Sequence, residues 1–180
     1  KLAALQQLGR TNDTADIFEL LIKQKPESST YYPQLAATYL GLAQSATSPA
    51  DAEIYNIRAA LTIERAQAHG HMNTPQHNFN LIGIYFNMGQ YEKAADLLEA
   101  GLKAGTIERE LKNYELWALA LQQMQQPVKG IDALKAASLA FPQSGEVEFR
   151  IAQAYQGLEK SEEALKHLQS AVAKGNLAKP

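Results

Sequence analysis

The sequence has no cysteine, one tryptophan and almost no excess of charge of either sign. Without cysteine the chain has no disulfide, thiol nucleophile or thiolate metal ligand, and such a chain fits the periplasm and the cytosol equally. The formal net charge of -2 gives no electrostatic reason to expect a nucleic acid or an anionic membrane as partner. No apolar run approaches the roughly 18 residues of a membrane span, so we expect no direct membrane insertion.

The residue patterns of enzymes and cofactor sites are also missing. We find no phosphate-binding glycine loop, no combination of serine, histidine and acid, and no paired carboxylates in an apolar setting. The acidic pairs Glu108/Glu110 and Glu162/Glu163 lie near expected helix starts, where negative charge suits the helix dipole. We therefore predict a protein that is not an enzyme and that has no cofactor.

The chain begins at Lys1 rather than at a methionine, and it shows no signal peptide. We expect a mature form or an excised fragment, so the missing signal does not locate the protein. Hydrophobic residues make up 46% of the chain and charged residues 20%, a composition that supports a folded core.

The clearest pattern is the segment 75–102, PQHNFNLIGIYFNMGQYEKAADLLEAGL. Its first half carries apolar residues at three- and four-residue spacing, which places them on one helical face; they are Leu81, Ile82, Tyr85 and Met88. Gly89 interrupts the pattern, and a second apolar face follows with Ala94, Leu98 and Gly101. The small residues Ala94 and Gly101 are expected to let the second helix lie close against the first. The segment predicts two helices joined by a tight turn.

The other segments follow the same plan, with one longer element. Ser48 can cap a helix with Pro49 at its first position, and this helix is predicted to reach about His69. Just after the end of this helix, Gly70 is expected to adopt a left-handed backbone conformation. Thr74 and Pro75 are expected to start the next helix in the same way.

Corresponding places in successive helix pairs give the period of the pattern. Tyr39, Tyr85, Leu121 and Tyr155 are separated by 46, 36 and 34 residues. A period near 34 with two helices per repeat resembles the tetratricopeptide family over essentially the whole chain. LIGIY at 81–85, GQY at 89–91 and IAQAY at 151–155 carry the resemblance. It implies an all-α, right-handed superhelical solenoid of antiparallel helix pairs.

We predict a single array belonging to a longer chain. It has a partial repeat at 1–28, a long repeat with an insertion at 29–74, and repeats at 75–110, 111–144 and 145–180. The long repeat has about twelve extra residues, mostly at 44–57, and Gly130 stands where the family usually has alanine. Apolar residues at both ends, Leu2, Leu5, Val172 and Leu177, predict that the native chain continues or that its edges meet a partner.

The resemblance also implies a place for function, because the first helix of each pair lines the concave face of such arrays. Exposed amides there can pair with both N–H and C=O groups of an extended peptide, and phenylalanines can hold apolar side chains. The alternative is that the amides only solvate a helix face and the phenylalanines pack between helices. The candidate residues for binding a peptide or protein segment are Gln34, Phe79, Asn80, Phe86, Asn87, Glu115, Gln122, Phe149, Arg150 and Gln153.

His69, His71 and His77 form the one local cluster with metal-ligand chemistry. Their spacing matches no closed tetrahedral set and no carboxylate is adjacent, so exposed loop histidines are the preferred interpretation and a metal site the alternative. Two other residues have simple expected places. We predict His167 on a helix surface and Trp117 in the core.

The segment 91–180 has a closer resemblance, to the C-terminal repeats of proteobacterial tetratricopeptide proteins found beside TonB–ExbB–ExbD systems. LLEAGL at 97–102, KNYEL at 112–116 and KGNLAKP at 174–180 carry it. It implies a periplasmic accessory that scaffolds an energy-transducing complex for outer-membrane uptake, with TonB, ExbB or ExbD as partner. The insertion and His69/His71 depart from that group and leave a different partner open. The rival functions are a self-associating structural module and a regulatory or assembly subunit of another envelope or cytosolic complex.

Overall fold

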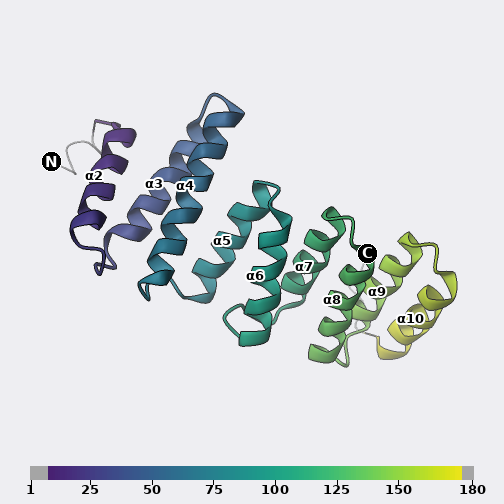
Figure 1. The fold of residues 1–180 in the computed structure, drawn as a ribbon. Helices are drawn as coiled ribbons and strands as arrows, with labels where there is room; N and C mark the ends of the chain where they lie inside the picture. Colours follow the sequence, from purple (N-terminus) through teal and green to yellow (C-terminus); the bar gives the residue numbers. More distant parts are fainter. Residues whose placement is uncertain (1–7, 176–180) are drawn as a thin grey trace. The chain divides into compact units, whose positions relative to one another are not determined.

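The computed structural model describes residues 8–175, and all statements on structure below refer to them. Within this range the chain forms nine α-helices and no strand, labelled α2 to α10 in Figure 1. None of the described helices combines the length and apolar character needed to span a bilayer. The chain divides into two units, residues 1–88 and 89–180, and each is described by itself.

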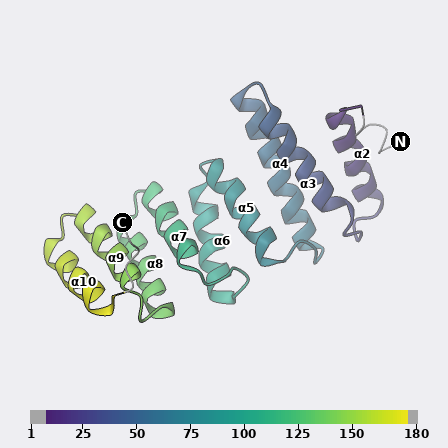
Figure 2. The same cartoon turned by 180° about the vertical axis from the view of Figure 1, so that it is seen from behind.

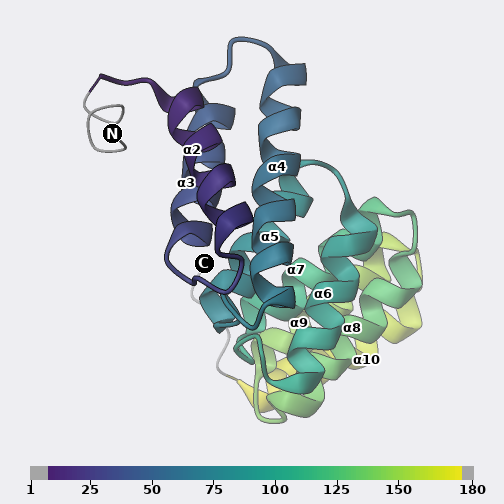
Figure 3. The ribbon, with the colours of Figure 1, turned by 60° about the vertical axis from the view of Figure 1, so that its left-hand side comes forward.

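The first unit contains α2 (Thr11–Gln24), α3 (Tyr31–Ser45), α4 (Pro49–Ala68) and α5 (Pro75–Asn87). Helices that follow one another in the chain pack together, and α3 and α4 form the most extensive pair. Figure 3 shows α2 in front of α3 and beside α4. The core residues that are almost fully buried are Phe18, Tyr32, Leu35, Ile63, Leu81 and Ile82.

The helix ends of this unit follow from local chemistry and confirm the predicted caps. The Ser48 side chain accepts a hydrogen bond from the N–H of Asp51, and Pro49 opens the 20-residue helix α4. Gly70 follows α4 with a positive φ of 79°, a conformation that glycine adopts without steric cost. The Thr74 side chain accepts from the N–H of His77 at the start of α5. Ser48 and Thr74 each satisfy a backbone donor that the helix itself leaves free.

The second unit contains α6 (Tyr91–Ala104), α7 (Leu111–Gln123), α8 (Pro127–Ala140), α9 (Gly145–Gly157) and α10 (Ser161–Lys174). Each helix packs against the next, and Figure 2 shows this succession from behind. Ala94, Leu98 and Gly101 are buried, as the pattern predicted. Val172 is 74% exposed, which agrees with an open apolar edge. Leu2, Leu5 and Leu177 lie outside the described residues.

Two buried glycines in this unit allow close approaches. A Cβ at Gly130 would lie 3.1 Å from the carbonyl oxygen of Ala118, so this glycine lets α8 approach the backbone of α7. A Cβ at Gly101 would lie 2.4 Å from Cδ1 of Ile107. The small residue at 101 therefore makes room for the loop after α6. Whether Gly101 also serves contact with the preceding helix stays a prediction.

The turns between α5 and α6, between α7 and α8, and between α9 and α10 repeat one backbone conformation. Gly89, Gln125 and Glu159 have φ values of 68°, 59° and 58° and occupy corresponding places. Gly89 was recognised from the sequence as a break in the pattern. Gln125 and Glu159 adopt the same left-handed conformation without glycine, at a cost of about 1–2 kcal/mol each.

Candidate protein-binding site

Four of the ten predicted binding residues surround one cavity in the second unit. Glu115 and Gln122 come from α7, and Arg150 and Gln153 come from α9. The cavity has a volume of about 240 Å³, and Leu134 and Ala154 complete its lining. Glu115 and Gln122 are two helical turns apart and so share a face of α7.

Arg150 is the centre of the polar contacts in this cavity. Its Nε lies 2.7 Å from Oε1 of Glu115, in an ion pair that is not aligned as a hydrogen bond. Its Nη2 lies 2.9 Å from Oε1 of Glu146, one turn earlier on α9. Its Nη1 donates to Oε1 of Gln153 at 3.3 Å. Two carboxylates thus face one guanidinium, which leaves an excess of one negative charge.

The amide groups in this cavity can form further hydrogen bonds. Gln122 and Gln153 are exposed, and an amide offers both donors and an acceptor. The Gln153 oxygen already accepts from Arg150, which orients its NH2 group as a donor. Leu134 supplies the apolar part of the lining. The arrangement suits an extended segment whose backbone pairs with the amides.

The remaining predicted residues are distributed differently. Phe149 is half-buried on α9. In the first unit Gln34 is exposed on α3, and on α5 Asn80 and Asn87 are exposed while Phe86 is half-buried. Phe79 is 36% exposed, and Gln76 donates to Asn80 at 2.8 Å. A binding role for these residues stays a prediction.

The histidines around residue 70 make contacts within the first unit. The rings of His69 and His71 lie 6.2 and 6.0 Å from the ring of Tyr32, measured between centroids. His71 Nε2 is 2.9 Å from the carbonyl oxygen of Glu27, and His77 Nδ1 is 2.9 Å from Oγ1 of Thr74. Among residues 8–175 no three histidine, cysteine or acidic side chains are grouped to hold a metal ion. His71 and His77 are half-buried rather than exposed.

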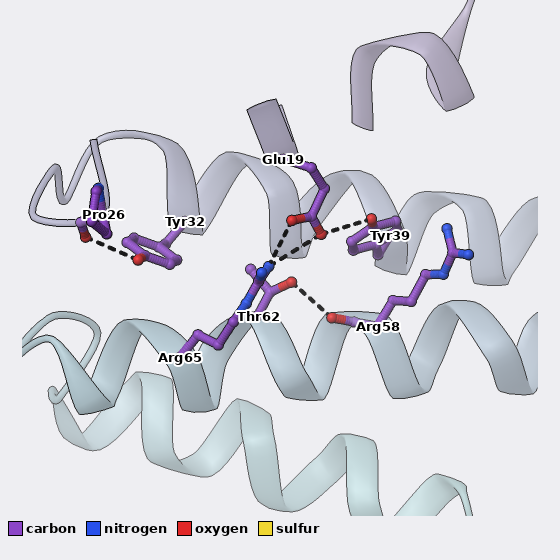
Figure 4. A network of polar contacts seen from close by, with 7 residues as sticks. All are labelled: Glu19, Pro26, Tyr32, Tyr39, Arg58, Thr62 and Arg65. Atoms are coloured by element: carbon purple, nitrogen blue, oxygen red, sulfur yellow. Dashed lines mark hydrogen bonds and ion pairs between the residues drawn. The ribbon is translucent and has the colours of Figure 1, made fainter. Parts of the chain in front are cut away.

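A larger cavity that the sequence did not reveal lies between α2 and α4. Its volume is about 600 Å³, and Tyr32 of α3 and Leu20, Ile22 and Pro26 form much of its apolar lining. At its edge Arg65 of α4 donates to both carboxylate oxygens of Glu19, at 3.1 and 3.0 Å. Figure 4 shows this ion pair with the hydroxyl of Tyr39, which donates to Glu19 at 3.0 Å. Because Glu19 and Arg65 belong to different repeats, no local pattern indicated their contact.

A second feature missed from the sequence is the buried carboxylate of Glu148. Its side chain is 7% exposed, and it accepts hydrogen bonds from Lys174 at 2.6 Å and Ser138 at 3.0 Å. His167 Nδ1 lies 2.7 Å from its other oxygen. The prediction of a surface position for His167 was therefore wrong, because the imidazole fills a polar space between α9 and α10.

Trp117 also departs from its predicted place. It was expected in the core, but it is only half-buried and lines a groove of about 300 Å³ between α6 and α8. The sequence placed it correctly among the apolar residues of α7. Whether a neighbouring helix covers Trp117 depends on how the helices pack, which the spacing of apolar residues in the sequence does not specify.

These features define the class of protein: the chain is an all-α helical repeat protein with a tetratricopeptide-like fold. No protein-family model matches the sequence, and no curated protein matches it. Among solved structures it is similar to MamA, at 17% identity and a TM-score of 0.59, over 95% of this chain and 92% of that one. It is also similar to MamA from Desulfovibrio magneticus RS-1, at 15% identity and a TM-score of 0.56, over 96% and 90% of the two chains. These likenesses show the fold.

Proposed function

We propose that this protein is a non-enzymatic interaction scaffold that captures a segment of a partner protein on α7 and α9. The observation that carries the proposal is the convergence of Glu115, Gln122, Arg150 and Gln153 on one cavity. These residues come from two repeats, so a segment that contacts all four crosses from one repeat to the next. The tetratricopeptide-like fold supports the same function.

The chemistry of the cavity defines the segment that it fits. The excess negative charge around Arg150 favours a segment with a lysine, an arginine or free N–H donors. The amides of Gln122 and Gln153 suit the backbone of an extended chain. Leu134 leaves room for one small apolar side chain beside them.

Site-specific photocrosslinking tests this proposal. A photoreactive phenylalanine analogue replaces Gln122 or Gln153 in the full-length protein, expressed in its native host. Lys129 of α8 and Lys166 of α10, both exposed and outside the cavity, serve as control positions. We expect a discrete crosslinked partner from 122 and 153 only. Equal products at all four positions, or none from 122 and 153, would contradict the proposal.

A narrower form of the proposal makes the protein a periplasmic accessory of a TonB–ExbB–ExbD system. Its support is the sequence resemblance of residues 91–180 to that group. Mass spectrometry of the crosslinked products and fractionation of the host cells test it. A crosslink to TonB, ExbB or ExbD, together with the free protein in the periplasmic fraction, supports this assignment. A cytosolic location or an unrelated partner contradicts it and leaves the interaction site on α7 and α9 intact.

A further inference from the structure

The groove that exposes Trp117 has a different position and chemistry from the cavity on α7 and α9. Its walls come from the second helices α6 and α8, and Tyr114 and Trp117 of α7 lie between them. Leu102 and Leu139 extend the apolar lining, and Leu139 is 86% exposed. A half-buried tryptophan in a mostly apolar groove is typical of the anchor points of protein interfaces.

Arg109 stands at this groove, and the loop that carries it is held in place. Ile107, which is 2% exposed, packs against Gly101, and its N–H donates to the Gly101 carbonyl at 3.2 Å. Nδ2 of the buried Asn113 donates to the carbonyl of Glu108 at 2.8 Å. Arg109 lies between these two contacts, and its Nε donates to the Leu102 carbonyl at 3.2 Å. This hydrogen bond holds the guanidinium beside the end of α6, at the groove.

The guanidinium of Arg109 has no carboxylate partner among the described residues. The neighbouring cation, Lys103, is paired with Glu99 at 2.5 Å on the same helix. An arginine presents several N–H donors in one plane, and a carboxylate can accept two of them together. The groove therefore combines a mostly apolar lining, with the Lys103–Glu99 ion pair at one side, and an arginine that has no carboxylate partner in the described part of the chain.

The corresponding place in the next repeat shows how this space can be closed. Tyr114 and Glu148 each lie seven residues before the matched positions Leu121 and Tyr155. At Glu148 the side chains of Lys174, His167 and Ser138 converge from α8 and α10 and satisfy the carboxylate. At Tyr114 an aromatic ring takes that place and the groove between α6 and α8 is open.

We propose that the groove between α6 and α8 is a second protein-binding surface, which takes a segment carrying an apolar side chain next to a carboxylate. The apolar side chain lies against Trp117 and Leu139, and the carboxylate accepts hydrogen bonds from Arg109. The position of the charge selects the segment, because an isolated apolar side chain leaves Arg109 unpaired. This surface is independent of the binding function proposed for α7 and α9.

Trp117 is the single tryptophan of the chain, so its fluorescence reports directly on this groove. The probes are three capped hexapeptides with central Phe-Asp, Phe-Asn or Ala-Asp flanked by alanines, together with N-acetylphenylalanine as a small acid. We expect a saturable fluorescence change with the Phe-Asp peptide. The Phe-Asn peptide loses the hydrogen bonds of a carboxylate to Arg109, and the Ala-Asp peptide loses the burial of the phenyl ring. Each should therefore bind at least about tenfold more weakly than the Phe-Asp peptide.

Variants locate the binding on the protein. Arg109→Gln should weaken the Phe-Asp peptide at least about tenfold, to the level of the Phe-Asn peptide. Lys129→Gln removes an exposed cation of α8 outside the groove and should leave affinity unchanged. Ala136→Glu places a carboxylate in the groove lining and should abolish binding, with circular dichroism as the check on folding.

No response from Trp117, equal binding of Phe-Asp and Phe-Asn, or a small acid that binds as tightly as the peptide would overturn the proposal. The Gln122→Ala/Gln153→Ala variant should bind the peptide normally, which separates the two surfaces.

Discussion

Lys174 of α10 and Glu148 of α9 form an ion pair in which Nζ lies 2.6 Å from Oε1. Burial alone would raise the pKa of the Glu148 carboxyl. The hydrogen bonds from Lys174, His167 and Ser138 outweigh it and lower the pKa to about 2. The buried Glu148 carboxylate and its three partners therefore stabilise the packing of α9 against α10.

This pair predicts how stability depends on acid. In the folded protein the pKa of the Glu148 carboxyl is lowered from 4.5 to about 2. Its contribution to the free energy of unfolding is therefore complete when the pH is above the pKa of the unfolded state. It is lost as the pH falls from about 4.5 towards 2, and by linkage it amounts to about 3 kcal/mol. Urea denaturation at pH 7 and pH 3 should show this loss in the wild type. Glu148→Gln should be less stable at pH 7 and should lose less between the two pH values.

Glu159→Gln is the matched control, because Glu159 is exposed in a turn. Its stability should follow the wild type at both pH values. An acid-dependent loss of the same size in Glu148→Gln would show that the ion pair is not its source.

The second prediction concerns Gly101. Alanine there would place a Cβ 2.4 Å from Cδ1 of Ile107, so the buried Ile107 side chain would have to move. We expect Gly101→Ala to destabilise the protein by about 1–3 kcal/mol in urea denaturation. In the further variant Gly101→Ala/Ile107→Ala the two effects should be less than additive.

Gly41→Ala provides the comparison for this helix glycine. A Cβ at Gly41 of α3 has nothing within 4 Å, so alanine should stabilise the helix by about 0.5–1 kcal/mol. A Gly101→Ala protein with the same free energy of unfolding as the wild type would contradict the close packing of Ile107 on α6.

The third prediction concerns the turn at Glu159, whose φ is 58°. Glycine adopts this conformation without the steric cost of a side chain, although it loses more freedom on folding. Glu159→Gly should therefore stabilise the protein by a net amount of about 0.5–1 kcal/mol, measured as a rise in thermal midpoint. Gly89→Ala, at the corresponding turn with φ of 68°, should have the opposite effect. A fall in midpoint for Glu159→Gly would contradict the left-handed turn.

The fourth prediction concerns the tyrosines of the first unit. Burial raises the pKa of Tyr32, Tyr39 and Tyr85, and the carboxylates of Glu19 and Glu64 raise the last two further. Tyr85 donates to Glu64 at 2.5 Å, and its pKa is raised most strongly. Stability from these groups is complete below the ordinary tyrosine pKa of about 10 and is lost as the pH rises above it.

Ultraviolet titration of phenolate formation measures this directly. We expect three tyrosines to ionise only together with alkaline unfolding. Tyr85→Phe should remove one of the tyrosines that ionise only on unfolding. It should therefore reduce the loss of stability between pH 10 and pH 12. Titration of all eight tyrosines near the ordinary value would contradict the buried contacts.

The sequence predicted which site residues share one helix face, but it did not predict the contacts that join different helices. Glu115 and Gln122 share a face by helical spacing, and so do Arg150 and Gln153, so the sequence could choose all four. Their meeting at one cavity required α7 and α9 to lie beside each other. Glu148 with Lys174, and Glu19 with Arg65, were missed because each contact joins helices whose facing side chains no local pattern identifies.

The sequence by itself determined the helices, their caps and the repeating plan. Periodicity and capping act within a few residues, so Ser48, Thr74 and Gly70 could be assigned without knowledge of the fold. Tertiary structure alone decided which apolar residues stayed exposed and which charged groups were buried. Trp117 lines an open groove and Glu148 a closed polar space because burial depends on what the neighbouring helices bring to the same place. That dependence is why the fold could be predicted from spacing, whereas the second groove became visible only with the packed helices.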